Sequence, residues 1–194
     1  MRLFAAIAVP AKERRRLHKA ATALRDAELP VRWVDVAAIH MTLKYLGEVP
    51  KDRVGLVRSS LATVAAKSRP FQVTLGGFGA FPSLRKPRII WAGAYASPEL
   101  RCLKHDLEWE FAGLGYEREA RAFHPHLTLG RARPEAAAGD FRDLEDLVEP
   151  LKYQGALSVH SVVLLRSTLG SEGAVYETID TVRLGEAAPA KASA

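Results

Sequence analysis

His40-Met41-Thr42-Leu43 and His126-Leu127-Thr128-Leu129 are two copies of one pattern, His-x-Thr-Leu, in a chain that holds only six histidines among 194 residues. Chance placement in a chain of this composition gives about 0.03 such tetrapeptides, so two copies indicate a repeated unit. Both copies lie in stretches typical of β-strands, in which side chains alternate between the two faces. The His and Thr of each copy should therefore share one face, while the apolar residues between and after them anchor the other.

Each copy thus offers one imidazole and one hydroxyl on the same side of a strand. Two imidazoles, of which one gives a proton while the other takes one, are what phosphodiester cleavage through a ribose ring requires. A single histidine on a half-buried strand is more often structural, and threonine is common in strands. The catalytic interpretation is favoured over the structural one because the same His and Thr pair recurs 86 positions later (126 − 40), again two residues apart.

Composition narrows the class of protein. A hydrophobic content of 48% is enough for one substantial core or two small ones, and no apolar run approaches a membrane span. The apolar start, 2–10, precedes a basic run, whereas a signal peptide has its charge first, so we expect a buried first strand. The lone Cys102 excludes an internal disulfide and favours a cytoplasmic setting. The net charge of +6 favours an anionic partner, although solvated helix faces are the commoner reason for such a charge.

The remaining pattern predicts alternating strands and helices. We expect strands at 2–9, 31–34, 39–46, 71–76, 88–95, 122–131, 155–165 and 174–183, and helices at 10–26, 52–67, 97–115 and 140–149. A Gly- and Pro-rich loop, 76–83, should separate two of the strands. Strands outnumber crossover helices, so the predicted class is α+β with mostly antiparallel sheets in two related lobes. Residues 1–185 would form one bilobal domain, and 186–194 a flexible tail.

The motifs and several flanking segments resemble the 2H phosphoesterase superfamily. Within it, the chain is most similar to the bacterial and archaeal RNA 2′,3′-cyclic phosphodiesterases, also called 2′-5′ RNA ligases or LigT-like proteins. The segments that carry the likeness are 2–7, Trp33, 40–47, 79–82, 87–93 and 123–131. The resemblance implies a pseudo-two-fold arrangement of two mostly antiparallel sheets flanked by helices, with an active-site cleft between the lobes.

The resemblance also implies an activity: opening of a 2′,3′-cyclic phosphate at an RNA end to a 2′-phosphate, with neither metal nor cofactor. Carried over by position, His40 would be the proton donor and His126 the proton acceptor, while Thr42 and Thr128 would bind the phosphate oxygens. RNA ends or small cyclic nucleotides would be the substrates of a monomeric enzyme. Two alternatives stay open: 2′-5′ RNA ligation as the physiological direction, and a non-catalytic RNA- or nucleotide-binding module.

Other residues are candidates for binding. Lys44 continues the face of His40 and Thr42 and could reach phosphate, and Arg131, beside Gly130, could swing into the cleft as a phosphate or RNA contact. His124 and His126 have a spacing that zinc-binding strands use, but a site would need a third ligand. The other histidines, His18, His105 and His160, are expected to be structural or at the surface. The aromatic residues Trp33, Tyr45, Phe81 and Trp91 could stack a base, although such residues are more often core.

Overall fold

The computed structural model describes residues 1–170 and 173–185, so the tail expected at 186–194 lies outside the described residues. Its strands are β1 (Arg2–Ala8), β2 (Val31–Trp33), β3 (His40–Glu48), β4 (Phe71–Phe81), β5 (Ile89–Ala94), β6 (His126–Ala132), β7 (Gln154–Val159), β8 (Ser161–Gly170) and β9 (Gly173–Arg183). They form one sheet in the order β7-β4-β5-β6-β3-β1-β8-β9, with β2 paired to β6. All of these pairings are antiparallel.

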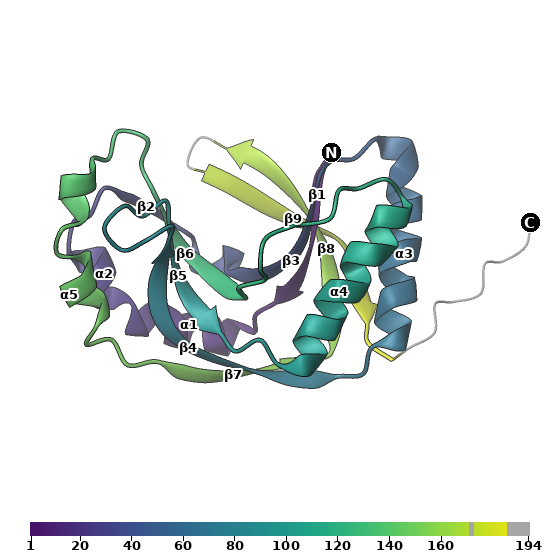
Figure 1. Ribbon diagram of the computed structural model, residues 1–194, viewed down its shortest axis with the longest axis horizontal. Helices are drawn as coiled ribbons and strands as arrows, with labels where there is room; N and C mark the ends of the chain where they lie inside the picture. Colours follow the sequence, from purple (N-terminus) through teal and green to yellow (C-terminus); the bar gives the residue numbers. More distant parts are fainter. Residues whose placement is uncertain (171–172, 186–194) are drawn as a thin grey trace, which may run out of the picture.

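The sheet consists of two halves that meet at a single residue pair. β3 and β6, the strands that carry the motifs, are paired only where Met41 faces Leu127. One half is β3-β1-β8-β9 and the other is β6-β5-β4-β7 with β2, and Figure 1 shows them as two lobes. The α+β class with antiparallel strands is confirmed. The two sheets expected from the sequence are joined in the structure into one sheet, whose two halves are connected at the centre by a single residue pair.

Each lobe is covered by its own helices (Figure 1). The helices are α1 (Ala11–Ala20), α2 (Thr22–Asp26), α3 (Val54–Lys67), α4 (Pro98–Gly113) and α5 (Leu144–Val148). α3 and α4 pack on the lobe of β3, and α1, α2 and α5 lie on the lobe of β6. Among the described residues, no helix combines the length and the apolar character that a membrane crossing needs.

The lobes are not successive halves of the chain. β4 and β5 follow the first motif strand but belong to the lobe of β6, while β8 and β9 follow the second motif strand and pair with the lobe of β3. The strand expected at 155–165 therefore divides at His160: Gln154–Val159 pairs with β4, and Ser161–Gly170 pairs with β1. Each lobe needs strands from both parts of the chain to complete its sheet.

Two further expectations about elements need correction. The Gly-rich segment expected as a loop is largely part of β4. A bulge between Leu75 and Phe78 contains Gly77, whose φ is +74°, and pairing with β5 resumes after the bulge. The helix expected at 10–26 divides at Ala21 into α1 and α2. There the Arg25 guanidinium donates to the His18 carbonyl at 2.6 Å, an oxygen that a continuous helix would use internally.

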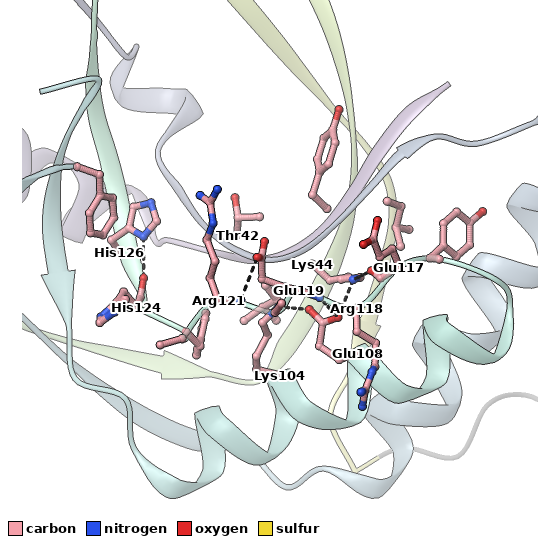
Figure 2. A pocket seen from close by; sticks show the side chains of 18 of the residues that line it. Thr42, Lys44, Lys104, Glu108, Glu117, Arg118, Glu119, Arg121, His124 and His126 are labelled. Carbon is pink, nitrogen blue, oxygen red and sulfur yellow. Dashed lines mark hydrogen bonds and ion pairs between the residues drawn. The ribbon is translucent and has the colours of Figure 1, made fainter.

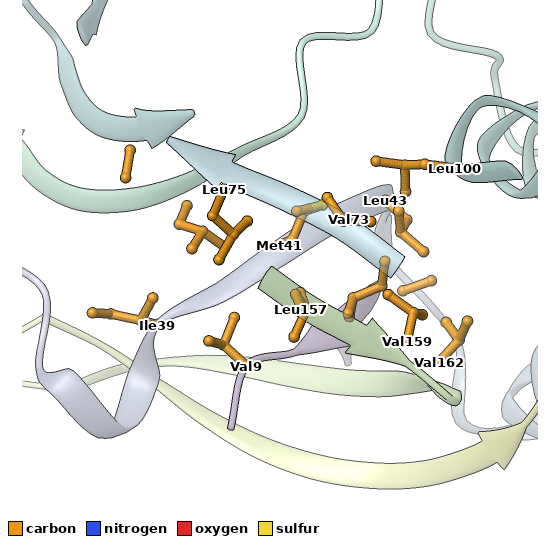
Figure 3. Packing of buried hydrophobic residues seen from close by; sticks show 14 of the residues in the cluster. Val9, Ile39, Met41, Leu43, Val73, Leu75, Leu100, Leu157, Val159 and Val162 are labelled. Atoms are coloured by element: carbon orange, nitrogen blue, oxygen red, sulfur yellow. The ribbon is translucent and has the colours of Figure 1, made fainter. Parts of the chain in front are cut away.

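The apolar residues of the motifs lie in the main core. Met41 and Leu127 are fully buried, and Leu43 and Leu129 nearly so. Figure 3 shows Met41 among buried side chains of other strands, such as Leu75 and Leu157. A smaller cluster formed by Phe4, Ala6, Val163 and Leu165, with Tyr176 packed against it, is separate from this core. Burial on one face thus fixes which way the His and Thr side chains point.

Candidate active site

The two His-x-Thr segments lie side by side at the junction of the lobes. His40, His126 and Thr128 are half-buried and Thr42 is exposed, opposite in parity to the buried Met and Leu residues. Met41 and Leu127 are the residue pair that joins the two strands, and His40, Thr42, His126 and Thr128 are the residues that flank this pair. The four polar side chains therefore lie on one face of the sheet where the two lobes meet.

Each imidazole is held by the same kind of hydrogen bond, from its Nδ1 to a backbone carbonyl oxygen two residues earlier. Nδ1 of His40 lies 2.7 Å from the carbonyl oxygen of Ala38, and Nδ1 of His126 lies 2.8 Å from that of His124. Because a carbonyl oxygen only accepts, each Nδ1 must carry a proton and donate it. Nε2 is then the atom of each ring that can take or give a proton to a bound molecule.

Aromatic rings from neighbouring strands pack against each histidine. His40 lies 5.0 Å from Phe4 and 4.8 Å from Tyr176, measured between ring centroids. His126 lies 5.1 Å from Phe81 in an edge-on arrangement, and 6.4 Å from Trp91. These contacts restrict rotation of the imidazoles, so Phe81 and Trp91, weighed from the sequence as base-stacking residues, support the second histidine in this structure.

The surroundings lower the pKa of both histidines below its usual 6.5. For His40, burial is the main cause, opposed by the hydrogen bond to Ala38 and reinforced by the charges of Arg131 and His126. For His126, burial is again the main cause, opposed by the bond to the His124 carbonyl and reinforced by Arg131 and His124. Without a bound anion, both rings therefore favour the neutral form near pH 7.

A bulge follows each motif and decides the direction of the next side chains. In β3, Thr42 pairs with Ala6 and Lys44 with Ala5, which leaves Leu43 as the extra residue. The same happens in β6, where Thr128 pairs with Trp91 and Gly130 with Ile90, leaving out Leu129. A bulge shifts the alternation of side chains by one position. Lys44 consequently leaves the face of His40, and Arg131 joins the face of His126.

The structure therefore corrects the expectation for Lys44. Its ammonium is buried and donates to Glu108 at 2.6 Å and to the carbonyl of Glu117. Lys104 pairs with the same Glu108 carboxylate. Lys44 thus anchors the segment between α4 and β6, and its ammonium is already paired. Arg131, by contrast, is exposed and acts electrostatically on both histidines, and its contact with phosphate or RNA stays a prediction.

A groove of about 1040 Å³ runs from His126 and Thr42 toward α4, and His40 and Thr128 are not among its lining residues. Figure 2 shows His124 and His126 at one end of the groove, Thr42 farther along it, and Arg118 and Glu117 toward the other end. Its charged lining residues are Lys44, Arg88, Lys104, Arg118 and Arg121 against Glu108, Glu117 and Glu119. Tyr45 also lines it and is 55% exposed. The charges of these lining residues sum to +2 (5 − 3). Arg118 and Arg121 carry no signal in the sequence, because they lie in an irregular segment.

Among the described residues, no third ligand joins His124 and His126 to form the zinc site considered from the sequence. Within the described ranges, no three His, Cys, Asp or Glu side chains are grouped so that they could hold a metal ion. His124 is exposed and contributes its carbonyl to His126. His105 lies at the surface of α4 against Trp109.

The fold thus places the two motif strands together at the junction of two lobes. The model of the 2′-5′ RNA ligase superfamily matches residues 9–170, and the chain belongs to this family. A protein from Aeropyrum pernix named RNA 2′,3′-cyclic phosphodiesterase is 29% identical over 174 residues, which cover 87% of this chain and 94% of the relative. A protein of the same name from Methanothermobacter thermautotrophicus is 28% identical over 161 residues, or 83% and 86% of the two chains.

Solved structures show the same arrangement. The crystal structure of TT0787 from Thermus thermophilus has a TM-score of 0.81 and 29% identity, and the match covers 95% of this chain and 98% of that one. The crystal structure of E. coli LigT complexed with 3′-AMP has a TM-score of 0.76 and 27% identity, with the same coverage.

Proposed function

We propose that the protein is a metal-independent RNA 2′,3′-cyclic phosphodiesterase that converts a terminal cyclic phosphate to a 2′-phosphate. The observation that carries the proposal is the matched pair of imidazoles, each fixed through Nδ1 and each next to the one residue pair that joins the two motif strands. In the proposal, one imidazole acts as the acid and the other as the base on a single phosphate. The family match and relatives named for this activity support the same reaction.

In the proposed mechanism, water attacks phosphorus while Nε2 of neutral His126 takes its proton. The bond from phosphorus to the ribose O3′ breaks, and protonated His40 gives its Nε2 proton to the departing oxygen. Thr42 and Thr128 donate hydrogen bonds to the non-bridging oxygens, whose charge grows in the transition state. The lowered pKa keeps His126 available as a base, and a bound phosphate anion favours the protonated form of His40.

The direct experiment uses an oligoribonucleotide with a 2′,3′-cyclic phosphate end in the presence of excess EDTA. Hydrolysis to the 2′-phosphate is expected. His40→Ala and His126→Ala should each lose about 10²–10⁴ in turnover, the scale of one general acid or base. His105→Ala, at an exposed histidine of α4, is the matched control and should keep full activity.

Two outcomes would contradict the proposal. Activity abolished by EDTA and restored by zinc would favour a metal site. Tight binding of the cyclic end by wild type and by both alanine variants, with no turnover by wild type, would favour a non-catalytic RNA- or nucleotide-binding module.

A further inference from the structure

Trp109 is an exposed tryptophan on α4, the helix that forms one side of the groove. Its side chain is 55% exposed, whereas Trp33 and Trp91 are half-buried. It follows Glu108, which lines the groove, by one position, which is about 100° around the helix. The indole therefore lies on the face of α4 next to the groove, outside the buried ion pairs of Glu108.

Arg118 connects this tryptophan to the groove. Its guanidinium carbon lies 4.0 Å from the centroid of the Trp109 ring, within the range of cation–π contacts. The same residue lines the groove, and Figure 2 shows it beside α4 at the end away from His126. Within the described part of the chain, no carboxylate forms an ion pair with Arg118, so its charge is open to an anion. We call Trp109 and Arg118 together the α4 platform.

A second arginine places positive charge between the α4 platform and the histidines. Arg121 lines the groove, and Figure 2 shows it between His126 and Arg118. Its guanidinium likewise has no ion pair among the residues that the structure describes. The phosphates of a strand that ends at His126 are therefore attracted along the groove toward the α4 platform.

The α4 platform has the chemistry of a site for single-stranded nucleic acid. Such sites combine a positively charged groove with aromatic rings on which bases stack, and an arginine beside the ring adds to the binding. A protein partner would instead favour a contiguous apolar patch. The exposed residues one turn before Trp109 are His105 and Asp106, and both are polar. The isolated aromatic ring beside a cationic groove therefore favours RNA over a protein.

We propose that the α4 platform binds a base of a single RNA strand, upstream of the end that reaches the histidines. The inference rests on the proposed function, because that function brings an RNA end to His40 and His126. The base stacks on the exposed part of the Trp109 ring, and Arg118 contacts an adjacent phosphate. A cyclic mononucleotide has no upstream base to place there. The protein should therefore bind strands more tightly than mononucleotides that carry the same end.

Two cyclic-phosphate substrates separate the α4 platform from the catalytic end. One is adenosine 2′,3′-cyclic phosphate. The other is an oligoadenylate of about ten nucleotides with the same end, a length within the site sizes of single-strand-binding folds. Trp109→Ala removes the stacking ring, Trp109→Phe keeps an aromatic ring, and Arg118→Ala removes the charge. Arg101→Ala is the matched control, because Arg101 is an exposed arginine of α4 that is not among the residues lining the groove.

We expect Trp109→Ala to raise KM for the oligoadenylate about tenfold, the scale of one lost base–aromatic stack, and to leave the mononucleotide reaction within about twofold. Trp109→Phe should retain most of the affinity. Arg118→Ala should also raise KM for the oligoadenylate and should reduce the slope of log KM against log salt by about 0.7, the value for one phosphate of a single strand. Arg101→Ala should match wild type on both substrates.

Equal effects of Trp109→Ala on both substrates would indicate a structural role and overturn the inference. An unchanged KM for the oligoadenylate, or a wild type that does not favour the oligoadenylate over the mononucleotide, would overturn it too. Fluorescence anisotropy with an oligoadenylate that ends in a 2′-phosphate makes the same comparison without turnover. Weaker binding by Trp109→Ala in that assay would support the inference even if wild type hydrolyses neither cyclic end, a result that refutes only the proposed function.

Discussion

Replacement of Glu108 by Gln tests the buried ion-pair network beside the groove. The Glu108 side chain is 10% exposed, and its carboxylate pairs with Lys44, which is 3% exposed, and with Lys104, which is 11% exposed. It also accepts a hydrogen bond from the backbone N–H of Glu119 at 3.1 Å. One carboxylate thus pairs with two buried ammonium groups and fixes the segment that leads from α4 to the second motif.

The expected loss of stability follows from this burial. Breaking a buried ion pair costs about 3–5 kcal/mol because an uncompensated charge stays behind. We expect about 3 kcal/mol for Glu108→Gln, the lower end of that range, because the amide oxygen can still accept from one lysine. Lys44→Met should cost less, about 1–2 kcal/mol, since Glu108 keeps Lys104.

Urea denaturation at pH 7 measures both changes, with Asp106→Asn at an exposed position of α4 as the control, expected within about 0.5 kcal/mol of wild type. The hydrogen bonds from Lys104, Lys44 and Glu119 outweigh burial and lower the pKa of Glu108. The stabilisation is therefore fully present above the ordinary pKa of 4.5 and is lost as the pH falls through the lower folded value. A cost equal to that of Asp106→Asn would refute the reasoning.

Three further predictions concern the site. The pH profile of kcat/KM should be bell-shaped with its optimum below 6.5, because both histidine pKa values are lowered; a rate that rises steadily from pH 5 to 9 would contradict this. Arg131→Ala removes a charge that lowers the pKa of both histidines, so the alkaline limb of the pH profile should move to higher pH. RNA binding should weaken more than turnover at saturation. An unshifted pH profile would place Arg131 away from the histidines. Gly79→Val should cost about 1–3 kcal/mol in urea denaturation, because its Cβ would lie 2.5 Å from the Trp91 ring, whereas Gly139→Ala meets open space and should cost far less; equal costs would contradict the packing.

Much of the site's geometry follows from strand parity, which the sequence displays. Met41 and Leu127 are apolar and alternate with His and Thr, and their burial in the core turns the polar side chains outward, as expected. The α+β class followed equally from the order of the elements. Both inferences depend on local pattern, which a single sequence carries well.

The bulges at Leu43 and Leu129 could not be inferred in the same way. A bulge depends on which strand pairs with which, and the partner strands β1 and β5 lie far from the motifs in sequence. This is why Lys44 was expected on the face of His40 and is instead buried against Glu108. Gly130 was expected to twist the strand end so that Arg131 reaches the cleft; in the structure the bulge one residue earlier puts Arg131 on the face of His126.

The aromatic support of His40 was also not visible in the sequence. Phe4 and Tyr176 come from strands at opposite ends of the chain, and neither belongs to a repeated pattern. Tyr176 is brought to His40 only because β8 and β9 return to the lobe of β3. Tertiary pairing of distant strands, and not local propensity, creates these contacts.

The central claim is that His40 and His126 act together in one chemical step. Single-turnover hydrolysis of a cyclic-phosphate end by wild type, His40→Ala, His126→Ala and the double variant tests it most directly. If both imidazoles serve the same transition state, the double variant should be about as slow as the slower single variant, because removing either group already disables the step. Losses that multiply in the double variant, or a single variant with wild-type turnover, would contradict the paired acid–base mechanism.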